Sequence, residues 1–114
     1  MPIPIGKKST KTSTNTYVNV FASNILTDPY LPGTFCVQYV ENNANAVTLK
    51  ITGSIDGVTF SDVDLDGTGT TQITVAKNSN GYATFEGSWV YLNVQVKSTV
   101  DDTHGSITVT VSQG

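Results

Sequence analysis

From Tyr17 to the end of the chain, apolar and polar residues alternate with a period of two. Alternation of this kind predicts strands that bury one face, and no segment shows the 3.6-residue period of a helix. The clearest half-buried strand is 47–55, in which Val47, Leu49, Ile51 and Ile55 alternate with polar residues. The pattern predicts about eight strands, over residues 17–22, 34–40, 47–55, 58–60, 71–76, 82–86, 88–98 and 107–111.

Turn residues separate these runs. Asp56-Gly57 stands between two apolar runs, which predicts a two-residue hairpin with a type I′ turn. The segment 77–81 ends in Gly81, which can take the positive φ of a glycine-bulged hairpin between 71–76 and 82–86. Residues 23–33 contain two prolines and form a long, turn-rich connection.

These elements predict an all-β fold: a single-domain, jelly-roll-like β-sandwich of antiparallel strands over residues 17–114. The length of 114 residues suits one domain, and the 38% hydrophobic and 13% charged residues suit short strands. Residues 1–16 read as an extended N-terminal arm that a lone domain cannot bury. The arm begins with Pro2-Ile3-Pro4-Ile5, whose two isoleucines we expect to dock on another surface.

Charge narrows the choice of partner. The net charge is −3, and Lys7, Lys8 and Lys11 lie in the arm, before all nine acidic residues. The chain has no arginine, the residue that best reads phosphate and guanine, so we expect no nucleic-acid partner. No apolar run has the length of a signal peptide or a membrane span, which predicts synthesis in a cytoplasm and no membrane partner.

Asp62, Asp64 and Asp66 have the spacing with which a calcium loop of the EF-hand type begins. Such a loop needs a bidentate glutamate at its twelfth position, where this chain has Ile73. The favoured interpretation is therefore that these aspartates lie on the solvent-exposed face of a strand end, and that Asp66-Gly67 begins a flexible turn. We expect no resident metal and no cofactor, with weak calcium binding as the open alternative.

Catalytic groups are sparse. The one cysteine, Cys36, excludes an internal disulfide and is most simply a small buried hydrophobic residue. The one histidine, His104, is most simply a turn residue, and no third group is evident that would orient a nucleophile and base pair. We therefore expect that the protein is not an enzyme.

Trp89 and Tyr91 are expected on one face of the strand 88–98, opposite the aliphatic residues that start at Val90. Three readings stay open for these rings. They are buried within the subunit, they anchor a contact with another protein, or they form a platform on which a sugar stacks.

Together these parts resemble small virion proteins of tailed bacteriophages, and capsid decoration (cement) proteins in particular. The resemblance rests on the basic arm, the hairpin Ser54-Ile55-Asp56-Gly57-Val58-Thr59-Phe60 and the strand Trp89-Val90-Tyr91-Leu92-Asn93-Val94-Gln95-Val96-Lys97-Ser98.

That resemblance implies a non-enzymatic protein of the virion that binds the outside of a capsid shell and stabilises it. It also implies the major capsid protein or another virion protein as partner, and a homo-oligomer, with a trimer favoured. The expected partner-binding residues are Ile3, Ile5, Lys7, Lys8, Lys11, Trp89 and Tyr91. The alternatives are a tail, fibre or baseplate component, and a carbohydrate-binding module that uses Trp89 and Tyr91.

Overall fold

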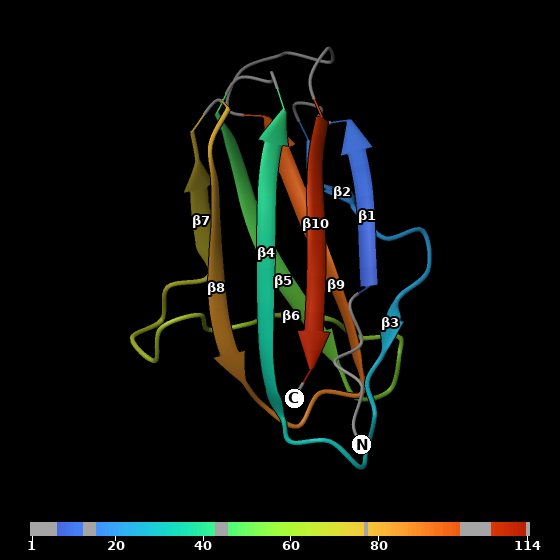
Figure 1. Cartoon of the computed structure of the whole chain (residues 1–114). Helices are drawn as coiled ribbons and strands as arrows, with labels where there is room; N and C mark the ends of the chain where they lie inside the picture. The colour runs from blue at the N-terminus through green and yellow to red at the C-terminus, as the bar shows by residue number, and fades with distance from the viewer. Residues whose placement is uncertain (1–6, 13–15, 43–45, 77, 99–105, 114) are drawn as a thin grey trace.

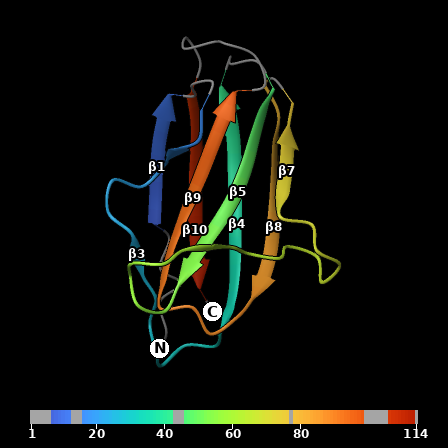
Figure 2. The same cartoon turned by 180° about the vertical axis from the view of Figure 1, so that it is seen from behind.

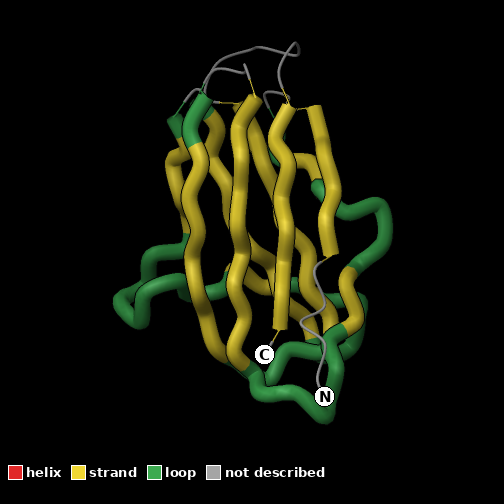
Figure 3. Tube along the Cα trace, in the orientation of Figure 1, coloured by secondary structure: helices red, strands yellow, loops and turns green. Residues whose placement is uncertain are grey.

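The computed structural model describes residues 7–12, 16–42, 46–76, 78–98 and 106–113, and for residues 7–12 and Asn42 it describes the backbone alone. Two antiparallel sheets pack face to face (Figure 1), and the described residues form no helix (Figure 3). The expected all-β, single-domain β-sandwich is thereby confirmed. The molecule extends over 40 × 28 × 27 Å.

One sheet has four strands and the other has six. The four-stranded sheet has the order β1-β10-β4-β8, with β1 Lys7–Thr12, β10 Ser106–Gln113, β4 Thr34–Asn42 and β8 Asn80–Glu86. The six-stranded sheet, which faces the viewer in Figure 2, has the order β2-β9-β5-β6, with β3 paired to β9 and β7 paired to β5. Its strands are β2 Val18–Asn19, β3 Ile25–Leu26, β5 Val47–Ser54, β6 Ser61–Asp62, β7 Gln72–Val75 and β9 Tyr91–Ser98.

The core lies between the sheets and is made mostly by the alternating residues that the sequence pattern identified, with Ile25 of the expected connection added. Val37, Leu49 and Val96 are each fully buried there. The rings of Phe35 and Phe85 stack across the β4 and β8 pair, with their centroids 5.1 Å apart. Successive side chains of a strand point to opposite faces of its sheet. Every second residue therefore points into the space between the two sheets and fills it.

Strand β5 is more buried than the sequence predicts. The expectation of a half-buried strand is wrong, because Thr48 and Thr52 on its other face are also buried. Ile55 lies beyond the end of the strand and is 71% exposed instead of joining the core. On the neighbouring strand β9, Asn93 pairs with Thr52 and is also buried, and its side chain contacts the segment between β2 and β3.

The segment between β2 and β3 is held by the buried amide of Asn93. Asn93 donates through Nδ2 to the carbonyl oxygen of Phe21 (3.2 Å) and to Oδ1 of Asn24 (2.8 Å), and its Oδ1 accepts from the Phe21 N–H (3.3 Å). Nζ of Lys50 lies over the ring of Tyr17, 4.4 Å from the ring centroid. The buried amide of Asn93 is thus matched by polar partners, as buried polar groups usually are, whereas the buried hydroxyl oxygen of Tyr17 has no hydrogen-bond partner among the described residues.

The hairpin at Asp56-Gly57 is not the expected type I′ turn. Gly57 has φ +78°, but Asp56 does not have the positive φ that this turn needs. The carboxylate of Asp56 accepts from the N–H groups of Val58 (2.8 Å) and Thr59 (2.9 Å), and the hydroxyl of Ser54 accepts from the N–H of Gly57 (2.9 Å). These side chains bond the local backbone and produce a longer loop between β5 and β6.

The second expected hairpin is wrong, because β7 and β8 belong to different sheets. The positive φ in this connection belongs to Asn78 (φ 56°), whose N–H donates to the carboxylate of the buried Glu41. Gly81 lies inside β8 opposite Tyr39, where an added Cβ would come within 2.7 Å of the tyrosine oxygen. Glycine is needed there for a close approach and not for a turn.

Part of the expected arm belongs to the sandwich. Strand β1 pairs with β10 over six residues, from Lys7 opposite Val111 to Thr12 opposite Ser106. Strand β10 of the same chain therefore pairs with this segment. The sequence alone predicted that it belongs to an arm that another protein must bind.

Candidate functional site

Three connections meet at one end of the sandwich: residues 27–33 between β3 and β4, residues 55–60 between β5 and β6, and residues 87–90 between β8 and β9 (Figures 1 and 2). The pairing of Thr34 with Glu86 and of Ser54 with Tyr91 places them side by side. Most of the large exposed hydrophobic side chains in the described residues gather here: Leu26, Tyr30, Ile55, Val58 and Val90. We call these five residues the apolar end.

Exposure at the apolar end is high for side chains of this kind. Tyr30 is 94% exposed, Val58 83% and Leu26 61%. Single exposed hydrophobic residues are ordinary on protein surfaces, whereas a group of them marks a contact with another molecule.

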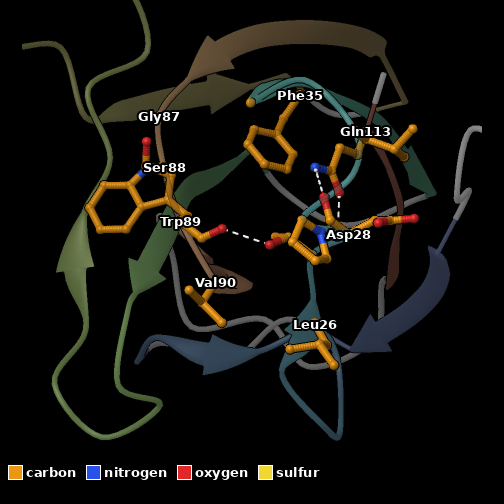
Figure 4. Close-up of a pocket in the computed structure, with 12 residues that line it drawn as sticks. Leu26, Asp28, Phe35, Gly87, Ser88, Trp89, Val90 and Gln113 are labelled. Carbon is orange, nitrogen blue, oxygen red and sulfur yellow. Dashed lines mark hydrogen bonds between the residues drawn. The ribbon is translucent and has the colours of Figure 1, made fainter.

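A groove opens at this end of the sandwich, with a volume of about 470 Å³. Figure 4 shows it between the connection 27–33 and the segment 87–90. The apolar side chains that line it include Leu26, Leu31, Phe35, Trp89 and Val90. Its size lies within the range of ordinary ligand or peptide sites.

The wall of the groove is held by Gln113, the last described residue of β10. Its Oε1 accepts from the N–H of Asp28 (2.7 Å), and its Nε2 donates to the carbonyl oxygens of Asp28 (2.9 Å) and Pro32 (3.2 Å). Figure 4 shows the two bonds to Asp28. One buried side chain therefore fixes the connection 27–33 against the sheet.

The opposite wall is fixed through the backbone on both sides of Val90. The N–H of Val90 donates to the carbonyl oxygen of Ser54 (3.0 Å), and its own carbonyl accepts from the N–H of Thr27 (2.9 Å). The hydroxyl of Thr27 donates to the carbonyl oxygen of Trp89 (2.6 Å). The groove is thus formed before any partner arrives, which reduces the ordering cost of binding.

Trp89 does not share a face with Tyr91, contrary to the expectation from the sequence. Strand β9 begins at Tyr91, so the alternation does not extend back to Trp89. The Trp89 ring packs against the core in the space that Gly53 leaves open, where an added Cβ would lie 2.5 Å from the ring. Its Nε1 is buried and has no hydrogen-bond partner among the described residues.

Tyr91 is half-buried and covers the loop after β5. An added Cβ on Gly57 would lie 3.1 Å from the Tyr91 ring. The two rings therefore serve separate packing contacts, and the flat pair that a sugar platform needs is not formed by them. Of the other expected partner-binding residues, Ile3 and Ile5 lie outside the described residues, and Lys7, Lys8 and Lys11 lie on β1.

The three aspartates of the calcium-like motif have other partners. Asp62 lies 3.2 Å from Nζ of Lys50. Asp64 accepts from the N–H groups of Gly67 (2.9 Å) and Gly69 (3.0 Å). The described residues contain no group of three or more potential metal ligands.

Asp66 closes the same loop. Its Oδ1 accepts from the hydroxyl of Thr68 (2.8 Å) and from the N–H groups of Thr68 (2.9 Å) and Thr70 (3.2 Å). Hydrogen bonds from Thr70 and Thr68 stabilise the charged form and hold the pKa of Asp66 well below its usual value of 3.8. The carboxylates of Asp64 and Asp66 therefore accept hydrogen bonds from the loop that carries them.

Of the two groups considered for catalysis, the described residues include only Cys36. Cys36 is half-buried on β4, where it alternates with the core residues Phe35 and Val37, so it is not the fully buried residue expected. His104 lies outside the described residues.

Sequence reasoning missed the apolar end itself. Leu26, Tyr30 and Val58 stand in or beside turn-rich segments, where apolar residues carry no periodic signal. One feature of the sequence does indicate these residues. They are large and apolar, yet they lie in segments whose turn-forming residues predict a surface position. Only the pairing of the strands shows that these segments share one end.

No model of a known protein family matches this chain, and no curated protein matches it. Among solved structures, it is similar in fold to a chain of the Bacillus endospore appendages, which form disulfide-linked pili; identity is 19%, the TM-score 0.51, and the match covers 97% of this chain and 86% of that one. It is also similar in fold to PirA, at 8% identity and a TM-score of 0.54, over 100% of this chain and 97% of that one.

Virus-related structures overlap more loosely. The SPBc2 prophage-derived protein YomS matches at 9% identity and a TM-score of 0.45, over 100% of this chain and 99% of that one. Chains of infectious bursal disease virus match at TM-scores of 0.43 and 0.42. At these identities the neighbours share a fold alone, and the looser overlaps carry no argument about function. None of the described segments forms a helix long and apolar enough to cross a membrane.

Proposed function

We propose that this protein is a non-enzymatic structural protein of a virion, which docks by its apolar end on a larger protein surface. The supporting observation is the group of exposed apolar side chains at one end of the sandwich, two of which, Leu26 and Val90, line a groove whose walls are already fixed by hydrogen bonds. Large apolar and aromatic residues in a preorganised pocket are typical anchors of protein contacts.

Within that role we propose capsid decoration, with the major capsid protein as partner. The sequence resemblance to decoration proteins supports this choice. The lysines of β1 add a basic strand to an otherwise acidic chain, and they suit an acidic capsid surface.

Val90 offers a sharp test because a matched control exists. Val90 lies at the apolar end and is 38% exposed, while Val40 lies on β4 and is 39% exposed. An aspartate at either position places the same charge at the same exposure. We expect V90D, but not V40D, to weaken binding to purified expanded capsids by about tenfold or more, as the loss of an interface anchor does.

The measurement is co-sedimentation of the protein with capsids, with circular dichroism to confirm that both variants are folded. Folded wild-type protein that does not co-sediment would overturn capsid decoration. Binding to purified tails instead would favour a tail, fibre or baseplate component. Equal losses in V90D and V40D would show that the apolar end is not the docking surface. Signal from the wild-type protein on a glycan array would favour the carbohydrate-binding module.

A further inference from the structure

Strand β8 forms one edge of the four-stranded sheet. Its seven residues pair with β4 on one side, and among the described residues no strand pairs with its other side. Its ladder with β4 runs without a bulge from Thr34 opposite Glu86 to Val40 opposite Asn80. A regular edge strand presents a row of backbone donors and acceptors to which another strand can add.

The two edges of this sheet differ in how they are protected. Strand β1, at the opposite edge, has lysine at three of its six positions, and edge lysines prevent further strand pairing. Strand β8 has no lysine and no proline, and its one charged residue is Glu86 at its end. Tyr82 stands near the middle of β8 and is 72% exposed. Of the two edges of this sheet, only β8 therefore lacks residues that prevent pairing with a further strand.

We infer that β8 is a self-association edge, and that a second copy of this chain adds its own β8 in antiparallel orientation. A two-fold axis at Ala83 would pair Tyr82 with the partner's Thr84, and Asn80 with the partner's Glu86. A two-fold contact of this kind closes on itself and gives a dimer.

Charge supports this register. Glu86 is the only charged residue of β8, and the axis at Ala83 places it beside the uncharged amide of the partner's Asn80. The two glutamates lie at opposite ends of the paired strands, so no like charges meet. Tyr82 and Thr84, which are both exposed in the single chain, become cross-strand neighbours on one face of the joined sheet.

The surroundings of β8 leave room for the added strand. A cleft of about 480 Å³ separates the end of β8 from the loop that contains Asp64 and Asp66. It is lined by Leu65 and Thr84 among others. The partner's Asn80 and Gly81 would enter this cleft, where a residue without a side chain fits easily.

The experiment uses size-exclusion chromatography with light scattering over a range of concentrations up to about 1 mM, which detects even weak association. We expect a concentration-dependent dimer for the wild-type protein. In the proposed register the two Thr84 residues are diagonal neighbours about 7–8 Å apart. T84K therefore places two like charges together, and we expect it to weaken the dimer by about tenfold or more.

A charge swap tests the register itself. T84E alone should also weaken the dimer, whereas an equimolar mixture of T84K and T84E should restore it as a mixed dimer. The matched control is Q38K, which adds the same charge on β4, at an exposed position opposite Tyr82. Circular dichroism confirms that each variant is folded, since both positions are exposed.

A wild-type protein that stays monomeric at all concentrations would overturn the inference. A dimer that T84K leaves unchanged, a mixture that fails to restore pairing, or a trimer would do the same. The inference does not depend on capsid binding, because the test uses the isolated protein. Failure of this test and failure of the V90D test are therefore separate results.

Discussion

Asp66 shows how a single residue can look like a metal ligand and have another role. Its spacing from Asp62 and Asp64 is that of a calcium loop, yet its carboxylate accepts hydrogen bonds from Thr68 and Thr70 of its own loop. A short polar side chain in a glycine-containing turn finds backbone N–H groups nearby, and these satisfy its oxygens.

The same bonds predict a pH dependence. The pKa of Asp66 lies below its usual value of 3.8, so its stabilisation of the loop is present above pH 3.8 and is lost as pH falls through the lower pKa. We expect the amide signals of Thr68 and Thr70 in NMR spectra to stay unchanged from neutral pH to 3.8 and to shift below it. D66N keeps an acceptor oxygen but cannot titrate, so its amide signals should not show this shift. A midpoint above 3.8 in the wild-type protein would contradict the assignment.

Trp89 is a second case at this scale. The sequence predicts it on the face of Tyr91, but the structure places its ring against Gly53 in the core. The period-two argument fails there because the residue lies two positions before the strand begins. The missing side chain at residue 53 creates the space, and no pattern around Trp89 indicates it.

At the scale of elements, the connection 27–33 depends on one residue of a distant strand. Gln113 makes three hydrogen bonds with Asp28 and Pro32 and is itself buried. The connection contains two prolines and has no ladder of its own. A contact between residues that lie far apart in the sequence therefore fixes the position of this connection and of one wall of the groove.

This contact predicts the effect of Q113A. Removing the amide leaves the N–H and carbonyl of Asp28 without their partner, which costs about 1–3 kcal/mol of unfolding free energy. The fluorescence of Trp89, the only tryptophan, should change because it lines the same groove. Urea unfolding measures the first effect and an emission spectrum the second. Q38A, at an exposed position on β4, is the control and should change neither.

At the scale of the whole molecule, the two proposed surfaces have a fixed relation. Strand β8 runs toward the apolar end, since the segment 87–90 follows it directly. Antiparallel pairing of two β8 strands therefore places the two apolar ends at opposite ends of the dimer. Such a dimer can join two surfaces, whereas a monomer can occupy only one.

This relation predicts that wild-type protein will cross-link capsids at concentrations where it dimerises. T84K should bind capsids and leave them separate, because it keeps the apolar end and loses the pairing edge. Dynamic light scattering of capsids mixed with each protein measures the difference. Cross-linking by T84K equal to that of the wild type would show that the two ends are not joined through β8.

Local pattern was enough to predict most of the longer strands and much of the core, but it missed β1 and predicted a strand at 58–60, which lies in a loop. Val37, Leu49, Val96 and Val109 are in the core as the alternation predicts, because the direction of a side chain along a strand depends on neighbouring residues alone. The positions of loops and the partners of strands depend on pairing between distant segments. For that reason only the tertiary structure decided that β7 and β8 lie in different sheets, that Trp89 fills the space at Gly53, and that three connections form one apolar end.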